Sequence, residues 1–196
     1  GRCIDSVRPV ADEIIVLDSF STDKTLLIAQ SAGAVVYQQN FRGYKEQKNA
    51  ALQYASHDYI LSIDADEALS VELVNSILTA KEKFAYSAYT MNRCNFFIGR
   101  FIRHGLWYPD KKIRLFNKHM AYWGGMNPHD KIILPGRATI GHLEGDLLHY
   151  SFSSIQEYEK RNDEISSIAA ESLYKIGKRS GIKILVNPVW RFLKSY

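Results

Sequence analysis

The sequence predicts an α/β protein whose sheet is mostly parallel and is covered by helices. Over the first 85 residues, short apolar strands alternate with helical segments, which is the pattern of strands joined by crossover helices. Polar side chains follow two of these strands, and ligands of open α/β sheets bind beyond the carboxyl ends of the strands. With 196 residues, the chain is long enough for one domain with a substantial hydrophobic core.

The elements of the first half follow from apolar runs and from helix-capping residues. Strands are predicted where apolar residues run together, and helices where Ser, Thr or Asp precedes residues at helical spacing and Gly follows them. These signals place a helix end at 3–7, strands at 13–17, 34–37 and 59–63, and helices at 26–32, 44–55 and 70–84. Ser70 is the predicted N-cap of the last of these helices.

The second half differs in composition. Residues 86–97 are rich in aromatic and β-branched side chains, and 112–116 and 121–123 are further short strands, separated by loops that carry Gly and Pro. This predicts a mixed, irregular sheet whose loops contact a second substrate. The capping box Ser154–Glu157 then begins a long helix that Gly177 closes.

We divide the chain into three parts. Residues 1–85 are expected to form an α/β half, 86–177 a second half of the same domain, and 178–196 a basic, amphipathic C-terminal segment. From Lys175 to Tyr196 there are six basic residues and no acidic one, interleaved with aliphatic and aromatic side chains. Such a segment fits either the surface of an anionic membrane or a packing partner in further C-terminal sequence. We expect sequence before Gly1 and after Tyr196.

Bulk composition excludes several classes of protein. The chain is 46% hydrophobic and 23% charged, which is ordinary for a globular protein, and a net charge of +4 is too small to indicate nucleic-acid binding. Cys3 and Cys94 give neither a disulfide framework nor zinc-ligand spacing. We found no apolar run that could span a bilayer and no signal peptide. We therefore expect a cytoplasmic protein.

The stretch around the third predicted strand contains acidic residues that could bind a metal ion. Asp64, Asp66 and Glu67 follow its apolar residues, and in an extended chain the two aspartates project to the same side. Carboxylates this close repel each other unless a cation lies between them, and oxygen ligands suit Mg²⁺ or Mn²⁺ shared with a phosphate. The alternative is a polar turn that caps the next helix. Together with Asp18 and with the Lys48-Asn49 pair, these carboxylates indicate a site for a nucleotide-diphosphate donor.

These stretches resemble glycosyltransferase family 2. The resemblance rests on Glu13-Ile-Ile-Val-Leu-Asp-Ser-Phe-Ser-Thr-Asp23, on Gly43-x-x-x-Gln-Lys-Asn-Ala-Ala-Leu52 and on Asp64-Ala-Asp-Glu67. The stretches 107–116 and 146–151 are similar to the branch of lipopolysaccharide-core β-1,4-glucosyltransferases, which use UDP-glucose. The resemblance implies the GT-A (nucleotide-diphospho-sugar transferase) fold, of which the first strand is missing here.

The resemblance also implies roles for individual residues. Asp18 would contact uracil or ribose, Lys48 the nucleotide, and Asp64 the ribose and sugar. Asp66 would be the main metal ligand. A His-Glu pair occupies the place of His129-Asp130 in relatives, so the shorter Asp130 would be the catalytic base.

Three residues of the predicted site have alternative interpretations. His149 is expected to complete the metal shell or to bind diphosphate, the alternative being a core histidine with satisfied hydrogen bonds. Arg114 is expected to stabilise charge on the departing UDP, the alternative being a surface salt bridge. For Asp130 the alternative is a loop turn after Pro128.

The predicted function is the transfer of a hexose, which we expect to be glucose, from a UDP-sugar. The transfer would depend on a metal ion and would invert the anomeric carbon. The acceptor would be a lipopolysaccharide-core or other lipid-linked glycan, and the protein a bacterial cell-envelope enzyme at the cytoplasmic face of the inner membrane. Two alternatives remain: a nucleotidyltransferase of related fold, or a non-catalytic module that binds sugar nucleotides or carbohydrate.

Overall fold

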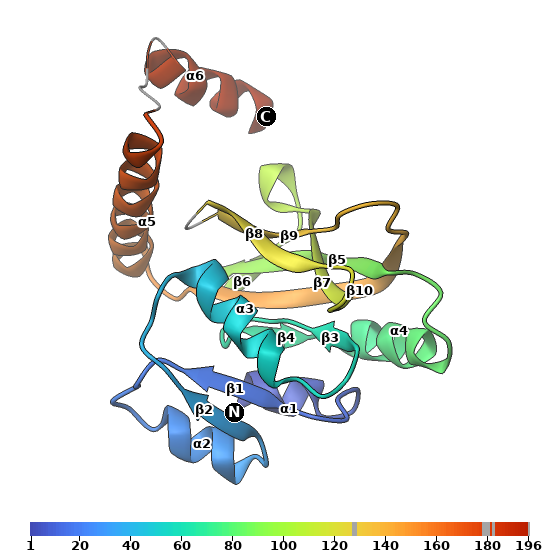
Figure 1. Cartoon of the computed structure of the whole chain (residues 1–196). Helices are drawn as coiled ribbons and strands as arrows, with labels where there is room; N and C mark the ends of the chain where they lie inside the picture. Colours follow the sequence, from blue (N-terminus) through green and yellow to red (C-terminus); the bar gives the residue numbers. More distant parts are fainter. Residues whose placement is uncertain (127–128, 178–180, 182, 196) are drawn as a thin grey trace.

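The computed structural model describes residues 1–126, 129–177, 181 and 183–195. Figure 1 shows the β1–β2 pair with α1 and α2 at one end of the molecule, the larger sheet in the middle, and α6 at the far end. The helices are α1 (Arg2–Val7), α2 (Thr25–Ser31), α3 (Tyr44–Tyr54), α4 (Val71–Glu82), the 3₁₀ helix η1 (Gly105–Trp107), α5 (Ile155–Lys175) and α6 (Lys183–Ser195). The strands are β1 (Ile15–Asp18), β2 (Val35–Gln38), β3 (Tyr59–Leu61), β4 (Glu67–Leu69), β5 (Ala88–Phe97), β6 (Arg100–Ile102), β7 (Asp110–Asn117), β8 (Tyr122–Met126), β9 (His129–Ile133) and β10 (Ile140–Phe152).

The strands form three sheets. The largest has the order β3-β7-β5-β10-β4, with β6 paired to β5, while β1–β2 and β8–β9 are separate pairs. The predicted α/β class and the mixed sheet are confirmed. The sheet is less parallel than expected, because only β1–β2 and β5–β10 are parallel among the described strand pairs. The long strands of the second half account for this difference, since β7 returns antiparallel beside β5 after a short connection.

Strand β3 lies at an edge of the described sheet rather than at its centre. It pairs with β7 on one side, and its three residues are half-buried, so the prediction of a fully buried strand is wrong for the described residues. The loop that leaves it at the carboxyl end carries Asp64 and Asp66 as expected.

The core lies between the large sheet and α4. Leu73 and Ile77 of α4 are almost fully buried, and they pack in one cluster with Met91 of β5 and Leu147 of β10. The predicted N-cap is confirmed, because Ser70 Oγ accepts a hydrogen bond from the Leu73 backbone N–H at 3.2 Å. Burial of this face of α4 fixes the register of β10, since β10 must present apolar side chains to it.

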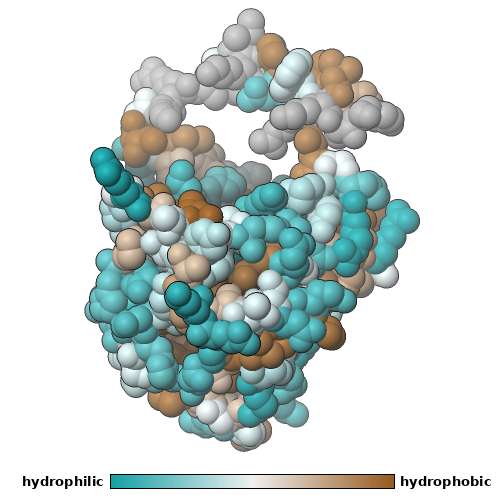
Figure 2. Space-filling model, turned by 90° about the vertical axis from the view of Figure 1, so that its right-hand side faces the viewer, coloured by the Kyte–Doolittle hydropathy of each residue, from teal (hydrophilic) through white to brown (hydrophobic). Residues whose placement is uncertain are grey.

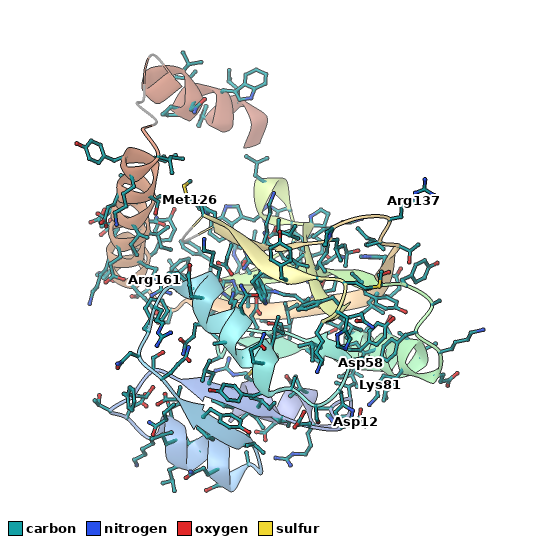
Figure 3. The ribbon with its side chains drawn as sticks, viewed as in Figure 1. Asp12, Asp58, Lys81, Met126, Arg137 and Arg161 are labelled. Carbon is teal, nitrogen blue, oxygen red and sulfur yellow. The ribbon has the colours of Figure 1, made fainter. Side chains whose placement is uncertain are left out.

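The other end of α4 is tied to the segment after α1. Lys81 Nζ donates to the carbonyl oxygen of Val10 at 2.8 Å and pairs with Asp12 Oδ2 at 2.7 Å. Lys81 and Asp12 lie close together in Figure 3. This contact joins α1 and the segment that leads to β1 to the main body.

Two features of the second half differ from the sequence prediction. The 13-residue strand β10 was not predicted, because its alternating polar and apolar residues are interrupted by Gly141 and Gly145. Helix α5 begins at the predicted capping box, with Ser154 Oγ accepting from Glu157 N at 3.1 Å. Its apolar residues are largely exposed, so α5 extends from the body instead of packing across the sheet.

Only part of the predicted basic segment can be compared with the structure. Residues 178–180, 182 and 196 of that segment lie outside the described residues. In the part of the chain that the structure describes, no helix has the length and apolar character needed to cross a bilayer.

Candidate active site

A tight turn after β3 separates the two aspartates. The Asp64 carbonyl oxygen accepts from Glu67 N at 2.9 Å, and Glu67 Oε2 accepts from Asp64 N at 2.9 Å. The prediction that Asp64 and Asp66 project to the same side assumed an extended chain. The chain is not extended here, and Asp64 and Asp66 have different charged partners. The alternative of a polar turn that caps the next helix is not met either, because β4 follows the turn and Ser70 caps α4.

Arg114 lies beneath this turn and is buried. Its Nη2 is 2.9 Å from Glu67 Oε1 and 3.1 Å from Asp64 Oδ2. Arg114 is 4% exposed and Glu67 is 1% exposed, so the alternative of a surface salt bridge is wrong. Glu67, which the sequence presents as a third exposed carboxylate, is the buried anchor of this arginine.

Burial and neighbouring charge act in opposite directions on these three groups. Burial raises the pKa of Glu67, as does the charge of Asp64, and these effects exceed the lowering by Arg114. Burial would also raise the pKa of Asp64, but Arg114 and Lys48 hold it below its usual value. Burial would lower the pKa of Arg114, yet the two carboxylates raise it. Asp64 therefore carries the negative charge that faces the open side of the site.

Lys48 of α3 joins Asp64 to Asp130. Its Nζ is 3.0 Å from Asp64 Oδ1 and 2.9 Å from Asp130 Oδ2. The same ammonium lies 4.2 Å from the centre of the Trp123 ring, on which the Arg114 guanidinium also lies at 5.3 Å. Two carboxylates that are 66 residues apart in sequence are thus held by one cation, with an aromatic ring beside it.

Asp130 is placed by a strand and not by a loop turn. It lies on β9, where it pairs with Gly125 of β8. Gly125 has φ +91°, and a Cβ there would lie 2.8 Å from the His129 carbonyl oxygen, so this position requires glycine. Pro128, from which a loop was predicted, lies outside the described residues.

Asp66 and His149 form a second pair at the edge of the site. His149 Nε2 is 3.4 Å from Asp66 Oδ2, while His149 Nδ1 is 2.7 Å from Asn95 Oδ1 and 2.9 Å from Ser151 Oγ. His149 is half-buried, with oxygen atoms beside both ring nitrogens, which fits a bound metal and also fits a histidine whose hydrogen bonds are satisfied within the protein.

This pair has the donor atoms of a divalent-cation site. A metal-ligating histidine usually donates its other N–H to an oxygen, and Asn95 Oδ1 lies in that position beside His149 Nδ1. A half-exposed carboxylate beside an imidazole nitrogen suits Mn²⁺, or Mg²⁺ with more oxygen ligands supplied by substrate. Among the described residues there is no cluster of three or more His, Cys, Asp or Glu side chains that could hold a metal. Asp66 and His149 would thus be the protein ligands, with phosphate oxygens completing the shell.

Asp18 lies at the end of β1, in a separate hydrogen-bond network. Its carboxylate accepts from the N–H and the Oγ of Ser21 and from Gln38 Nε2 at 3.0 Å, and Gln47 Nε2 donates to Ser19 Oγ. Burial would raise the pKa of Asp18, but these hydrogen bonds hold it below its usual value. Asp18 is buried, and its partners Ser21 and Gln38 are not those of Asp64, so among the described residues Asp18 lies outside the Lys48 cluster.

A buried carboxylate on β10, Asp146, was missed in the sequence. Asp146 of β10 accepts from Arg103 Nη1 and from Tyr108 Oη, the latter at 2.9 Å. Its own N–H donates to Ser70 Oγ at 3.1 Å. Asp146 thus ties the loop between β6 and β7 to the sheet. The only signal in the sequence was its place at the start of the quoted stretch 146–151.

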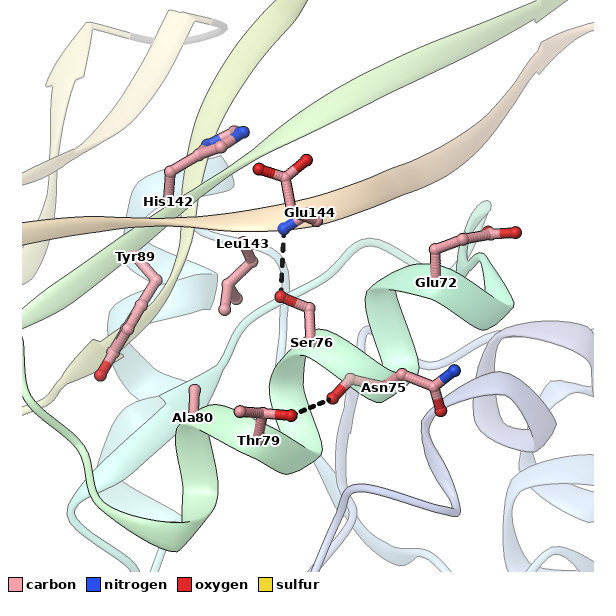
Figure 4. A pocket seen from close by; sticks show the side chains of 9 residues that line it. All are labelled: Glu72, Asn75, Ser76, Thr79, Ala80, Tyr89, His142, Leu143 and Glu144. Atoms are coloured by element: carbon pink, nitrogen blue, oxygen red, sulfur yellow. Dashed lines mark hydrogen bonds between the residues drawn. The ribbon is translucent and has the colours of Figure 1, made fainter.

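A shallow cavity of about 420 Å³ lies elsewhere, between α4 and β10 (Figure 4). Its lining includes Glu72, His142 and Glu144, with Ser76 Oγ accepting from Glu144 N at 3.0 Å. None of the predicted site residues lines this cavity.

Solved structures of similar fold support a class for this arrangement. The structure of S. aureus TarS 1-349 has a TM-score of 0.56 and 15% identity, and it covers 85% of this chain and 60% of that one. TarS 1-349 in complex with UDP-GlcNAc has a TM-score of 0.55 and 16% identity, and it covers 87% of this chain and 62% of that one. The chain thus spans about three-fifths of these structures. The fold is that of GT-A-type glycosyltransferases.

Sequence comparisons give the family. The model of glycosyl transferase family 2 matches residues 1–134. An uncharacterized glycosyltransferase of Rickettsia bellii is 34% identical over 212 residues, covering 100% of this chain and 70% of the relative. The lipopolysaccharide core biosynthesis glycosyltransferase LpsC of Rhizobium meliloti is 28% identical, covering 100% of this chain and 75% of the relative.

The chain belongs to glycosyltransferase family 2. The predicted family, fold and enzyme class are confirmed. Because the class is that of an enzyme that transfers sugars, the alternatives of a nucleotidyltransferase and of a non-catalytic module are not favoured.

Proposed function

We propose that this protein is an inverting, metal-dependent glycosyltransferase that moves a hexose from a UDP-sugar to a glycan acceptor. The observation that carries the proposal is the position of Lys48, whose ammonium lies within 3.0 Å of Asp64 on the donor side and 2.9 Å of Asp130 on the acceptor side. A displacement reaction needs a charged donor site and a base on opposite sides of one carbon atom. We assign the two carboxylates these roles, with residues 1–85 as the nucleotide-sugar-binding half and 86–177 as the acceptor-side half; their shared contact with Lys48 supports the assignment.

In the proposed reaction the acceptor hydroxyl attacks the anomeric carbon from the face opposite the diphosphate. The new carbon–oxygen bond forms while the bond to the diphosphate oxygen breaks, which inverts the anomeric carbon. The hydroxyl proton passes to the Asp130 carboxylate. Lys48 holds that carboxylate through a charge-assisted hydrogen bond and keeps it near Asp64.

The donor side would be held by three groups. Asp18 would bind the uracil or ribose, Asp64 the ribose and sugar, and Asp66 with His149 a Mg²⁺ or Mn²⁺ ion. Such an ion, when bound, would neutralise charge on the departing diphosphate. Because Arg114 is buried behind two carboxylates, we propose that it acts on UDP through the position of Asp64 rather than by direct contact.

Glucose and a lipopolysaccharide-core acceptor are the specific substrates we propose. The similarity to LpsC, whose name includes lipopolysaccharide core biosynthesis, supports the acceptor class. The TarS structure in complex with UDP-GlcNAc supports a UDP-linked donor.

We further propose that α6 lies on an anionic membrane at the cytoplasmic face. Val186, Val189, Trp190 and Leu193 are 55 to 64% exposed, and they follow i, i+3, i+4, i+7 spacing along one helix face. Figure 2 shows hydrophobic side chains at this end of the molecule. Flotation with vesicles of phosphatidylglycerol should carry the protein, whereas vesicles of phosphatidylcholine alone should not. Trp190→Glu should abolish flotation, and retained flotation would contradict this proposal.

The function is tested with a donor screen on the full-length protein. UDP-glucose and other UDP-hexoses are offered with Mn²⁺, with Mg²⁺ and with EDTA, and released UDP is measured. Asp66→Ala should abolish turnover and weaken UDP binding, whereas Asp130→Asn should keep UDP binding and lose transfer. Asp163→Asn, an exposed carboxylate on α5, is the matched control and should retain activity. Turnover that EDTA leaves unchanged would reject the metal, and normal transfer by Asp130→Asn would reject the base.

A further inference from the structure

Asn49 makes an unusual contact with the hairpin that carries Asp130. Its Nδ2 donates to the carbonyl oxygen of Trp123 at 2.7 Å, and its Oδ1 accepts from the N–H of Trp123 at 2.9 Å. Both halves of one side-chain amide thus bind both backbone groups of one residue. This is the pairing that a neighbouring strand would supply to β8.

The contact lies two residues from the partner of Asp130. Trp123 pairs with Ile132 and Gly125 pairs with Asp130, so holding Trp123 fixes the position of Asp130 through the hairpin. Lys48, the residue before Asn49, meets the Asp130 carboxylate directly and lies over the Trp123 ring. One turn of α3 therefore holds the hairpin at its backbone and at its carboxylate.

Only asparagine satisfies this arrangement. Trp123 is 4% exposed, so its outward N–H and C=O need partners, and an alanine at 49 would leave both without one. An aspartate has the same shape but no donor, and it would place a carboxylate oxygen against the Trp123 carbonyl oxygen. A glutamine carries the same groups one methylene further from the helix.

We infer that Asn49 is a positioning residue, which sets the distance between Asp130 and the donor site by clamping β8. The inference rests on the proposed role of Asp130 as the base. The side-chain hydrogen bonds of Asn49 go to Trp123 and, among the described residues, none goes to Asp64 or to the Asp66–His149 pair, so its loss acts on transfer and not on donor binding. The sequence contains Asn49 within the quoted Gln-Lys-Asn stretch, but nothing in that pattern shows what it contacts.

The test compares Asn49→Asp and Asn49→Ala with Gln53→Ala, which replaces an exposed amide on the same helix. Steady-state kinetics with the UDP-sugar give kcat and KM, and hydrogen exchange followed by mass spectrometry reports on peptides covering 121–133. We expect kcat to fall at least tenfold in both Asn49 variants, with the donor KM within twofold of wild type. Exchange in 121–133 should be faster, and exchange in β5 and β7 should stay the same. Gln53→Ala should match wild type in every measurement.

Each other outcome overturns the inference. Wild-type kcat in both Asn49 variants, or unchanged exchange in 121–133, would show that the clamp does not position Asp130. A raised donor KM would place Asn49 on the donor side instead. Failure of the proposed base is seen separately, as normal transfer by Asp130→Asn. The exchange measurement still decides in that case whether Asn49 orders the hairpin.

Discussion

Removal of the Arg114 side-chain charge is the most direct test of the charge arrangement. In Arg114→Met the methylene stem is largely kept, but Glu67, which is 1% exposed, loses the guanidinium at 2.9 Å. Asp64 loses its contact at 3.1 Å but keeps Lys48 at 3.0 Å. The variant thus leaves the buried Glu67 with a weaker compensating charge, that of Arg93, whose Nη1 is 3.9 Å from Glu67 Oε1.

The expected loss of folding stability follows from that burial. Removing one partner of a buried ion pair costs about 3–5 kcal/mol, since the remaining charge is unpaired and desolvated. For a domain of 150–250 residues, each kcal/mol lowers Tm by about 2–4 °C, so a decrease of roughly 6–20 °C is expected. Lys112→Met is the control, because the Lys112 side chain is 40% exposed and its pairing with Asp110 should contribute at most about 1 kcal/mol.

The loss should also depend on pH. The pKa of Glu67 is raised in the folded protein, so the folded state keeps this proton to higher pH than the unfolded chain, and this group makes stability fall as pH rises through that window. Without Arg114 the pKa rises further, so protonation in acid removes the charge of Glu67. Urea unfolding at pH 8 and pH 5 should therefore give a smaller difference between wild type and Arg114→Met at pH 5. The double variant Arg114→Met/Glu67→Gln should recover part of the loss.

Two results would refute this reasoning. A loss below about 1 kcal/mol at pH 8 would mean that water reaches Glu67 and that the pair is not buried in solution. A loss that stays constant between pH 8 and pH 5 would mean that a neutral Glu67 or a change in packing explains the effect.

Three further predictions concern other parts of the molecule. Ser70→Ala removes the acceptor of two backbone N–H groups, those of Leu73 and Asp146, and should cost about 1–2 kcal/mol in urea unfolding; Ser166→Ala on exposed α5 should cost far less. Gly125→Ala places a Cβ 2.8 Å from a backbone oxygen at positive φ, so transfer should fall while UDP binding measured by calorimetry is kept; equal loss of both would contradict this. Burial, with the charge of Glu67, raises the pKa of Cys3 to about 11, so iodoacetamide at pH 8 should label native Cys3 far more slowly than the urea-unfolded protein, and equal rates would disprove it.

Strand β10 shows how a strand can be missed when it is predicted from sequence periodicity. Strand β10 places Asp146 against Ser70 and places His149 beside Asp66, yet its 13 residues were not predicted as a strand. Glycines at 141 and 145 interrupt the alternation on which strand prediction depends. Gly145 has φ +95°, and a Cβ there would lie 2.3 Å from the Leu73 backbone N, so it permits close approach of β10 to α4. Gly145 is thus required by packing, and it also breaks the alternation from which β10 could have been predicted.

The sequence by itself determined the α/β class, the end of a strand at Asp18, the caps at Ser70 and Ser154, and the family. These depend on neighbours along the chain, because periodicity, capping and motif spacing are local properties. Only the tertiary structure decided that Glu67 is a buried anchor, that Lys48 links Asp64 to Asp130, and that Asn49 clamps the hairpin. Burial and pairing of a charge depend on which distant segments meet, and no pattern within one segment contains that information.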